Sequence, residues 1–230
     1  MIRGYFGVPG VGKTTVLTKI AKKEYRKIKL GRSKYTNIFT INFNVNLPGI
    51  IEIKWNDLST YKFYDSLILI DEMTLVADNR KFKEFRDGHR DFFTLHRHLG
   101  CDIVYTTQDF EKIDSKIRAL TFDLWYMTKS VVPFFRQFTF AKRIYRNIAI
   151  NEHTSDLVYG YRFCNFLEAL FVSNFQLIYR KPLYKLFDSY SELSLSYRPN
   201  YLAPLIHSYP EIIKKSLHSY LNKIGRRALK

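Results

Sequence analysis

Short apolar runs alternate with helically spaced apolar residues over the first part of the chain. Five runs have the length and composition of buried strands, namely residues 2–6, 35–45, 67–70, 102–108 and 121–132. Helical character is found in the stretch after residue 15 and in residues 81–99 and 109–120. Strands that alternate with helices favour a parallel sheet covered by helices. The pattern therefore predicts an α/β domain with a mainly parallel sheet flanked by helices.

The pattern is less regular after Pro133. Residues 134–150 are aromatic and basic without an acid, which fits paired strands at the sheet edge with aromatics in the core, or a surface on which bases stack. Residues 50–53 fit a short strand or a hairpin arm, and residues 211–230 a basic amphipathic helix. We expect a first domain over residues 1–150 and a small mixed or helical extension over residues 151–230, aromatic and basic and packed on the first.

A glycine-rich loop separates the first strand from the first helix. Residues 7–15 read GVPGVGKTT and fit the pattern G-x-x-x-x-G-K-[ST], in which backbone N–H groups surround a phosphate at the positive end of a helix. The lysine brings a charge to the outer phosphates, and the following threonine hydroxyl can bind Mg²⁺. The candidate phosphate-binding residues are Gly7, Pro9, Gly10, Val11, Gly12, Lys13, Thr14 and Thr15, and Thr14 is also a candidate metal ligand.

Polar side chains follow two of the predicted strands. Asp71 comes directly after the run at residues 67–70, where it can complete a Mg²⁺ site opposite Thr14. Glu72 is then placed to orient and deprotonate a water that attacks the γ-phosphate. Gln108 ends another strand, and from a position beside the Asp71 strand it can reach the γ-phosphate or the water. The pattern predicts Asp71 as a metal ligand and Glu72 and Gln108 as catalytic residues.

Composition and charge indicate a folded protein that meets a polyanion. Hydrophobic residues make up 46% of the 230 residues, which excludes a disordered chain, and the formal net charge is +16. Such a charge favours nucleic acid or an anionic membrane surface as a partner. The two cysteines have no metal-ligand or redox spacing, and we expect neither a signal peptide nor a transmembrane helix. The cytoplasm is therefore the expected location.

Three segments, GVPGVGKTT, LILIDE and HRHLGCDIVYTTQ, together resemble the zonula occludens toxin-like family, the P-loop assembly ATPases of filamentous phages. That family is similar to the FtsK/HerA class of DNA-pumping motors. The resemblance covers about residues 1–130, and its most specific part is the spacing of Arg97, Gly100 and Gln108. It implies a P-loop NTPase fold with ATP and Mg²⁺ as cofactors. By resemblance, Lys13 and Thr14 hold ATP and Mg²⁺, Asp71 and Glu72 form the Walker B pair, and Gln108 senses the γ-phosphate.

The resemblance also implies a ring. In motors of this class ATP lies between subunits, and an arginine of the neighbouring subunit completes the site. Arg97 and Arg118 are the candidates for that arginine, with Arg90 behind them.

We expect an ATP-driven, homo-oligomeric motor for virion assembly or genome translocation that acts on single-stranded viral DNA. Family members usually continue into a transmembrane helix and an outer domain, and we expect neither here. A basic tail or an assembly partner would then bring the motor to the inner face of the membrane, or the motor would package DNA into a different capsid. A small-molecule kinase of the P-loop class shares the phosphate loop, and a nucleotide-dependent binding module with little turnover is a further alternative. Glu72 beside Asp71 suits water activation, and the charge suits a polymer, so both favour the motor.

Overall fold

The centre of the fold is a nine-stranded sheet, seen in a computed structural model that describes residues 1–79, 87–129, 136–150, 157–163 and 174–187. Its strand order is β3-β2-β4-β5-β1-β6-β7-β8, and β9 also pairs with β7. The strands are β1 (Ile2–Phe6), β2 (Asn37–Ile41), β3 (Ile50–Glu52), β4 (Ser66–Ile70), β5 (Asp102–Thr107), β6 (Asp123–Lys129), β7 (Phe138–Ile150), β8 (Leu157–Phe163) and β9 (Phe175–Tyr179). In this order, the strands β3, β2, β4, β5, β1 and β6 all run parallel to one another. This confirms the predicted α/β class with a mainly parallel sheet.

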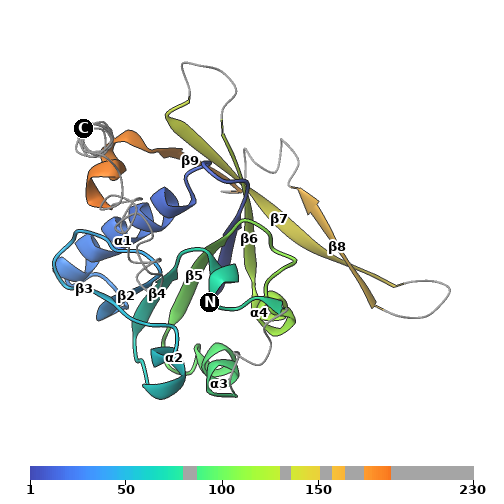
Figure 1. The fold of residues 1–230 in the computed structure, drawn as a ribbon, viewed down its shortest axis with the longest axis horizontal. Helices are drawn as coiled ribbons and strands as arrows, with labels where there is room; N and C mark the ends of the chain where they lie inside the picture. The colour runs from blue at the N-terminus through green and yellow to red at the C-terminus, as the bar shows by residue number, and fades with distance from the viewer. Residues whose placement is uncertain (80–86, 130–135, 151–156, 164–173, 188–230) are drawn as a thin grey trace, which may run out of the picture. The chain divides into compact units, whose positions relative to one another are not determined.

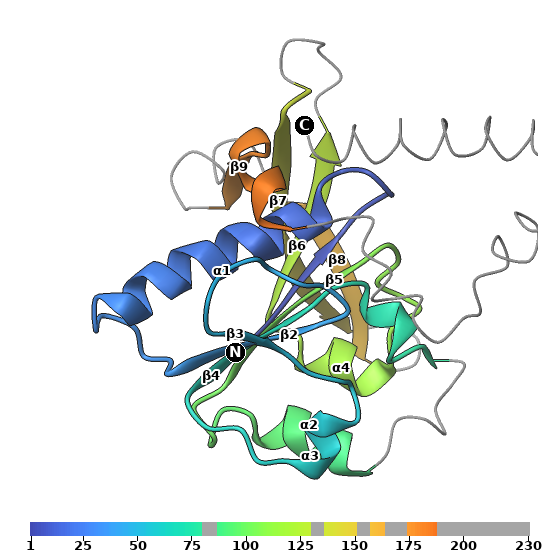
Figure 2. The same cartoon turned by 60° about the vertical axis from the view of Figure 1, so that its left-hand side comes forward.

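Helices cover both faces of the parallel part (Figures 1 and 2). On one face lies α1 (Lys13–Lys29), and on the other lie α2 (Asp57–Thr60), α3 (Asp87–Leu95) and α4 (Ser115–Leu120). Two short 3-10 helices, η1 (Met73–Leu75) and η4 (Lys181–Leu186), complete the described helices.

The alternation of side chains along β4 shows how the sheet separates two cores. Leu67 and Leu69 pack in the cluster that contains Leu17 of α1, whereas Ile68 and Ile70 pack in the cluster that contains Phe93 of α3. All five residues of β4 are buried, as expected for a central parallel strand covered on both faces. The core therefore holds the carboxyl end of β4 in a fixed place.

The sheet continues past residue 150. β7 runs antiparallel to β6, and its other edge pairs with β9 over Phe138–Lys142 and with β8 over Ile144–Ile150. Residues Met1–Phe187 therefore form one compact unit, and the expected division at residue 150 falls inside the sheet. The helix expected at residues 211–230 lies outside the described residues, as does most of the expected extension.

Several local expectations differ from the structure. β3 is parallel to β2, so residues 50–53 are not a hairpin arm. Residues 138–150 form one long strand instead of a pair. The helix expected from Asp109 begins only at Ser115, because the Asp114 carboxylate caps it by accepting the Lys116 N–H at 2.8 Å. The helix expected over residues 81–99 is seen only as α3, and residues 80–86 lie outside the description.

Candidate functional site

The glycine-rich loop connects the end of β1 to the first turn of α1. Gly12 caps the helix with a φ of 95°, in the left-handed region that favours glycine, and its carbonyl accepts the Val16 N–H at 3.2 Å. A Cβ on Gly7 would lie 2.6 Å from the Met127 carbonyl oxygen of β6, so close approach to the sheet requires glycine there as well. Gly10 and its neighbours Val8 and Pro9 are exposed. The loop thus presents its backbone to solvent at the amino terminus of α1.

Lys13 lies inside the curve of this loop. Its buried ammonium donates to the carbonyl oxygen of Gly7 at 2.8 Å and to that of Val8 at 3.4 Å. Burial lowers the pKa of Lys13, while the charges of Glu72 and Asp71 raise it. The cation is thus held between the loop backbone and the two acids, where it can contact an anion in the loop.

Asp71 joins the loop to the carboxyl end of β4. Its Oδ2 accepts a hydrogen bond from the Thr14 hydroxyl at 2.6 Å, and its Oδ1 accepts one from the Thr106 hydroxyl of β5. Burial raises the pKa of Asp71, and the bonds from Thr106 and Thr14 oppose that effect. Two possible metal ligands, the Thr14 hydroxyl oxygen and the Asp71 carboxylate, therefore lie side by side, as the sequence predicts. Oxygen donors of this kind suit Mg²⁺.

Glu72 has an unusual backbone conformation. Its φ is 48° and its ψ is 70°, a left-handed conformation that costs free energy for a residue other than glycine. The Glu72 N–H donates to the Thr106 hydroxyl at 3.1 Å, which holds that conformation. Its carboxylate accepts the Thr74 hydroxyl at 2.6 Å and the Gln108 N–H at 3.2 Å. The turn therefore directs the Glu72 carboxylate toward the end of β5.

The strand order brings the three sequence signals together. β5 lies between β1 and β4, with Phe6 opposite Thr107 and Ile70 opposite Tyr105. Gln108 follows directly after β5 and has an exposed side chain, while its backbone N–H contacts Glu72. The expectation that the Gln108 strand lies beside the Asp71 strand is therefore correct.

The two candidate arginines lie at opposite ends of β5. Arg97 lines a recess with Asp65 and Asp102 at the amino end of the strand. The six residues of β5 rise about 3.3 Å each, so roughly 20 Å separates that recess from Gln108. Arg118 instead lines a cavity of about 340 Å³ with Gln108 of the same chain. Arg118 thus lies near its own site, whereas Arg97 is too distant to reach it.

Sequence reasoning missed Arg180, which packs against the phosphate loop from the segment between β9 and η4. A Cβ on Gly12 would lie 2.7 Å from the Arg180 Cδ, and the guanidinium donates to the Gly10 carbonyl oxygen at 3.4 Å. Arg180 is 7% exposed, and its Nε has no hydrogen-bond partner among the described residues. The Thr139 hydroxyl of β7 donates to the Val11 carbonyl beside it. Arg180 lies 170 positions from Gly10 in a segment without periodicity, so no local signal indicated it.

Three other missed residues surround the acids. Thr106 bonds to both Asp71 and the Glu72 backbone, the Thr74 hydroxyl holds the Glu72 carboxylate, and the Asn42 side-chain amide donates to the Asp71 carbonyl at 3.0 Å. Thr106 was within reach of sequence reasoning, because it lies two residues before Gln108 at the polar end of a predicted strand.

A glycine loop between a parallel strand and a helix, with an acid pair on a nearby strand, defines the fold and site of a P-loop NTPase. The family model of the Zonular occludens toxin (Zot) matches residues 1–192, and the chain belongs to this family. The match includes the loop, both acids and Gln108, and it confirms the resemblance seen in the sequence.

Two solved structures resemble this chain to different degrees, and the first of them shares its fold. The N-terminal domain of zonular occludens toxin from Neisseria meningitidis has a TM-score of 0.50 and 17% identity, over 81% of this chain and 97% of that chain. The genome packaging NTPase B204 from Sulfolobus turreted icosahedral virus 2, in complex with ATP-gammaS, has a TM-score of 0.39 and 11% identity, over 69% and 95% of the two chains. Curated proteins give no match.

Within the ranges that the structure describes, no helix combines the length and the apolar character needed to cross a bilayer.

Proposed function

We propose that this protein hydrolyses ATP at the carboxyl edge of its parallel strands and uses the energy in phage virion assembly or genome translocation. One observation carries the proposal. The Thr14 hydroxyl and the Asp71 carboxylate meet at 2.6 Å beside Lys13, and the Glu72 carboxylate is held next to them by Thr74 and the Gln108 backbone. A phosphate-binding loop, a metal-ligand pair and a general base thus occupy one edge of the sheet.

The residues have separate tasks in this proposal. Thr14 and Asp71 would hold Mg²⁺, and that ion, when bound, neutralises charge on the β- and γ-phosphates. Lys13 and the loop N–H groups bind the phosphates. Glu72 accepts a proton from the attacking water, and Gln108 orients that water or contacts the γ-phosphate.

The motor role rests on the family and on charge. The Zot family match covers residues 1–192, and the formal charge of +16 favours a polyanionic track. In this proposal the protein is a homo-oligomer, in a ring, that acts on single-stranded DNA in the host cytoplasm. Its contact with the membrane or with a membrane-bound assembly partner is peripheral. An arginine of a neighbouring subunit completes each site.

Phosphate release from Mg·ATP tests the chemistry. Lys13→Ala should lose ATP binding, measured with a fluorescent ATP analogue. Glu72→Gln should still bind ATP but hydrolyse it at least about a hundredfold more slowly, the usual contribution of a general base. Glu52→Gln changes an exposed glutamate at the far edge of the sheet and serves as the control. Hydrolysis by Glu72→Gln at the wild-type rate would contradict the assignment of the base.

The same assay distinguishes a motor from a kinase. A motor releases inorganic phosphate and is stimulated by single-stranded DNA. Turnover that requires a small acceptor, with phosphate transferred to it and no response to DNA, would favour the P-loop kinase instead.

A further inference from the structure

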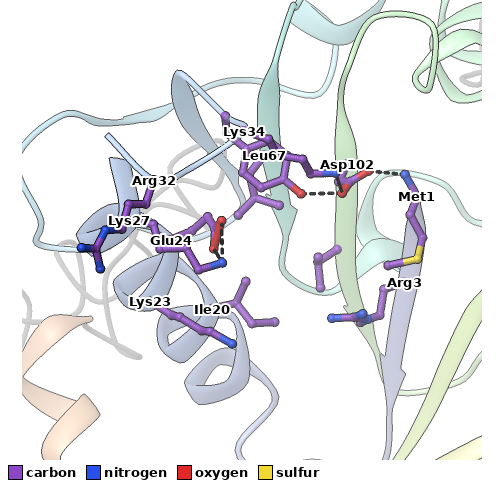
Figure 3. A pocket seen from close by; sticks show the side chains of 12 residues that line it. Met1, Arg3, Ile20, Lys23, Glu24, Lys27, Arg32, Lys34, Leu67 and Asp102 are labelled. Atoms are coloured by element: carbon purple, nitrogen blue, oxygen red, sulfur yellow. Dashed lines mark hydrogen bonds and ion pairs between the residues drawn. The ribbon is translucent and has the colours of Figure 1, made fainter. Parts of the chain in front are cut away.

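A basic cavity lies at the amino end of the parallel strands, away from the phosphate loop at their carboxyl end. Figure 3 shows the side chains that line it. The cavity has a volume of about 410 Å³ and is lined by β1, α1, the segment after α1, β4 and β5. The helix α1 connects the two sites, because it begins at Lys13 and presents Lys23 and Lys27 to the cavity. At 1.5 Å per residue, about 15 Å of helix separates Lys13 from Lys23.

Positive charge dominates the cavity wall. Lys27 pairs with Glu24 at 2.9 Å, and Lys34 pairs at 2.7 Å with Asp102, which also pairs with the Met1 amine. Among the described residues, no ion pair is found for the other two exposed cations, Lys23 and Arg32. The cationic lining residues are Arg3, Lys23, Lys27, Arg32 and Lys34, and the acidic ones are Glu24 and Asp102.

Two of the cations face each other. The ends of the Lys23 and Arg3 side chains point toward one another across the cavity in Figure 3. Arg3 forms an ion pair with Asp123, whose Oδ2 accepts from the Arg3 Nε at 2.7 Å, but the same carboxylate also pairs with Arg143 at 2.9 Å. One acid is thus shared between two guanidinium groups, and positive charge is left over at Arg3. Like charges that face each other across a recess repel, and an anion between them removes that cost. The arrangement therefore fits an anionic group.

The rest of the wall indicates what carries that anion. Ile20, Leu67 and Val104 form an apolar surface, and the Tyr35 ring lies beside them with the Lys34 amine 4.9 Å from its centroid. Cations next to apolar and aromatic surface are the combination that binds a phosphate and its attached base in single strands. A volume of about 410 Å³ falls within the range of small-ligand pockets.

We propose that this cavity binds the phosphodiester backbone of a single-stranded nucleic acid. The Arg3 side chain is only 29% exposed, so a flat lipid surface reaches it poorly, and a stiff duplex cannot bend its phosphates into the recess. A flexible single strand can. The inference extends the proposed function, since it names where the strand is held, but the binding itself does not require ATP hydrolysis.

The test compares two charge-matched double variants of the whole 230-residue chain. Lys23→Gln/Arg32→Gln removes the two unpaired exposed cations of the cavity, and Lys54→Gln/Lys116→Gln removes two exposed lysines elsewhere. Affinity for a fluorescein-labelled oligothymidine is measured by anisotropy over a salt series, with circular dichroism to verify folding. Each lost phosphate contact should reduce the slope of log K against log salt by about 0.7. The cavity variant should therefore bind about tenfold more weakly at low salt, with a slope shallower by about 1.4, while the control keeps the wild-type values.

Equal affinities and slopes for the cavity variant and the control would overturn the inference. So would an unchanged oligothymidine affinity together with lost binding to phosphatidylserine vesicles, which would assign the cavity to a membrane. Basal ATP hydrolysis, measured in parallel without DNA, should stay at the wild-type rate in both variants. If the wild-type protein shows no hydrolysis but the cavity variant loses oligothymidine binding, the proposed ATPase fails and this inference stands.

Discussion

Arg180 connects the antiparallel end of the sheet to the phosphate loop. It donates to the Gly10 carbonyl oxygen at 3.4 Å and to that of Arg136, and its stem fills the space that glycine leaves at position 12. We interpret Arg180 as a positioning residue that holds the loop backbone from behind. It contacts carbonyl oxygens, which point away from the N–H groups that would face a phosphate.

Arg180→Ala should weaken ATP binding more than it slows turnover. Loss of a charged donor costs about 1.5 kcal/mol or more, so the KM for ATP should rise about tenfold or more while kcat changes little. Arg180→Lys should restore part of the affinity, because an amine can reach one of the two carbonyls. The exposed neighbour Lys181 provides the control variant Lys181→Ala. If kcat instead fell about tenfold while the KM for ATP stayed unchanged, Arg180 would not act by positioning the loop.

The pKa of Asp102 leads to a second prediction at the scale of residues. Burial alone would raise its pKa, but hydrogen bonds from Lys34, the Met1 amine and Tyr35 outweigh that effect and hold the pKa at about 2. Because the folded pKa is below the unfolded value, Asp102 stabilises the fold above the unfolded pKa. That stabilisation is lost as the pH falls through the folded pKa.

Asp102→Asn should therefore lower the free energy of unfolding at neutral pH, by up to about 2 kcal/mol. This corresponds to a fall in Tm of about 4–8 °C for a chain of this size. The difference from wild type should shrink below about pH 4 and be mostly lost by pH 2, as the pH reaches the folded pKa. Thermal unfolding across that pH range measures it, and Asp91→Asn, an exposed carboxylate on α3, should show little effect at any pH. A constant Tm difference down to pH 2 would mean that the Asp102 charge is not the cause.

At the scale of elements, β5 and β7 organise the molecule. β5 lies between β1 and β4 and supplies Thr106, which bonds to both the Asp71 carboxylate and the Glu72 backbone. β7 pairs with β6 on one edge and with β8 and β9 on the other, and its Thr139 contacts the phosphate loop. The strands after residue 150 therefore support the loop although they lie far from it in sequence.

A protein truncated after Phe187 should fold, whereas one truncated after Ile150 should not. The longer protein keeps the whole compact unit Met1–Phe187. The shorter one loses β8, β9 and Arg180, which leaves the long strand β7 with an unpaired edge that is prone to aggregate. Soluble expression and cooperative thermal unfolding of the two proteins decide between these outcomes. Equal Tm values for both would show that residues 151–187 add nothing to the stability of the unit.

At the scale of the whole molecule, the position of Arg97 bears on assembly. About 20 Å of β5 separates it from Gln108 of its own chain, so Arg97 can act on a nucleotide only in a neighbouring subunit. Arg118 instead lines a cavity with Gln108 of its own chain, so it lies near the site of that chain.

Mixing inactive variants should restore activity if Arg97 acts between subunits. Arg97→Ala should bind ATP normally and hydrolyse it about a thousandfold more slowly, the usual contribution of an arginine finger. Addition of Lys13→Ala subunits should then recover some hydrolysis. In a mixed ring, the intact phosphate loop of an Arg97→Ala subunit can lie next to the intact Arg97 of a Lys13→Ala subunit. Arg118→Ala is mixed in the same way for comparison. An absence of recovery, with a monomer in light scattering, would argue against an arginine finger at position 97.

The sequence by itself determined the α/β class, the phosphate loop and the acid pair. These signals are local, since a glycine loop, a buried run and the carboxylates that end it lie within a few residues of one another. The parallel order followed from helices between strands, and Gln108 was placed beside the Asp71 strand correctly. The start of α4 was misplaced, because the position of a cap depends on one side chain, that of Asp114.

Only the tertiary structure decided which distant residues complete each site. Arg180 and Gly10 are 170 positions apart, and Tyr35 and Asp102 are 67 apart, so no periodicity connects them. Residues 19–34 contain eight lysines and arginines and a single acid, and nothing in the sequence separates these cations from one another. On α1 it divides, with Lys19 donating to the Leu177 carbonyl of β9 and Lys23 facing Arg3 across the cavity. A helix distributes consecutive residues around its axis, and the strand packed beside each face then determines what each side chain meets.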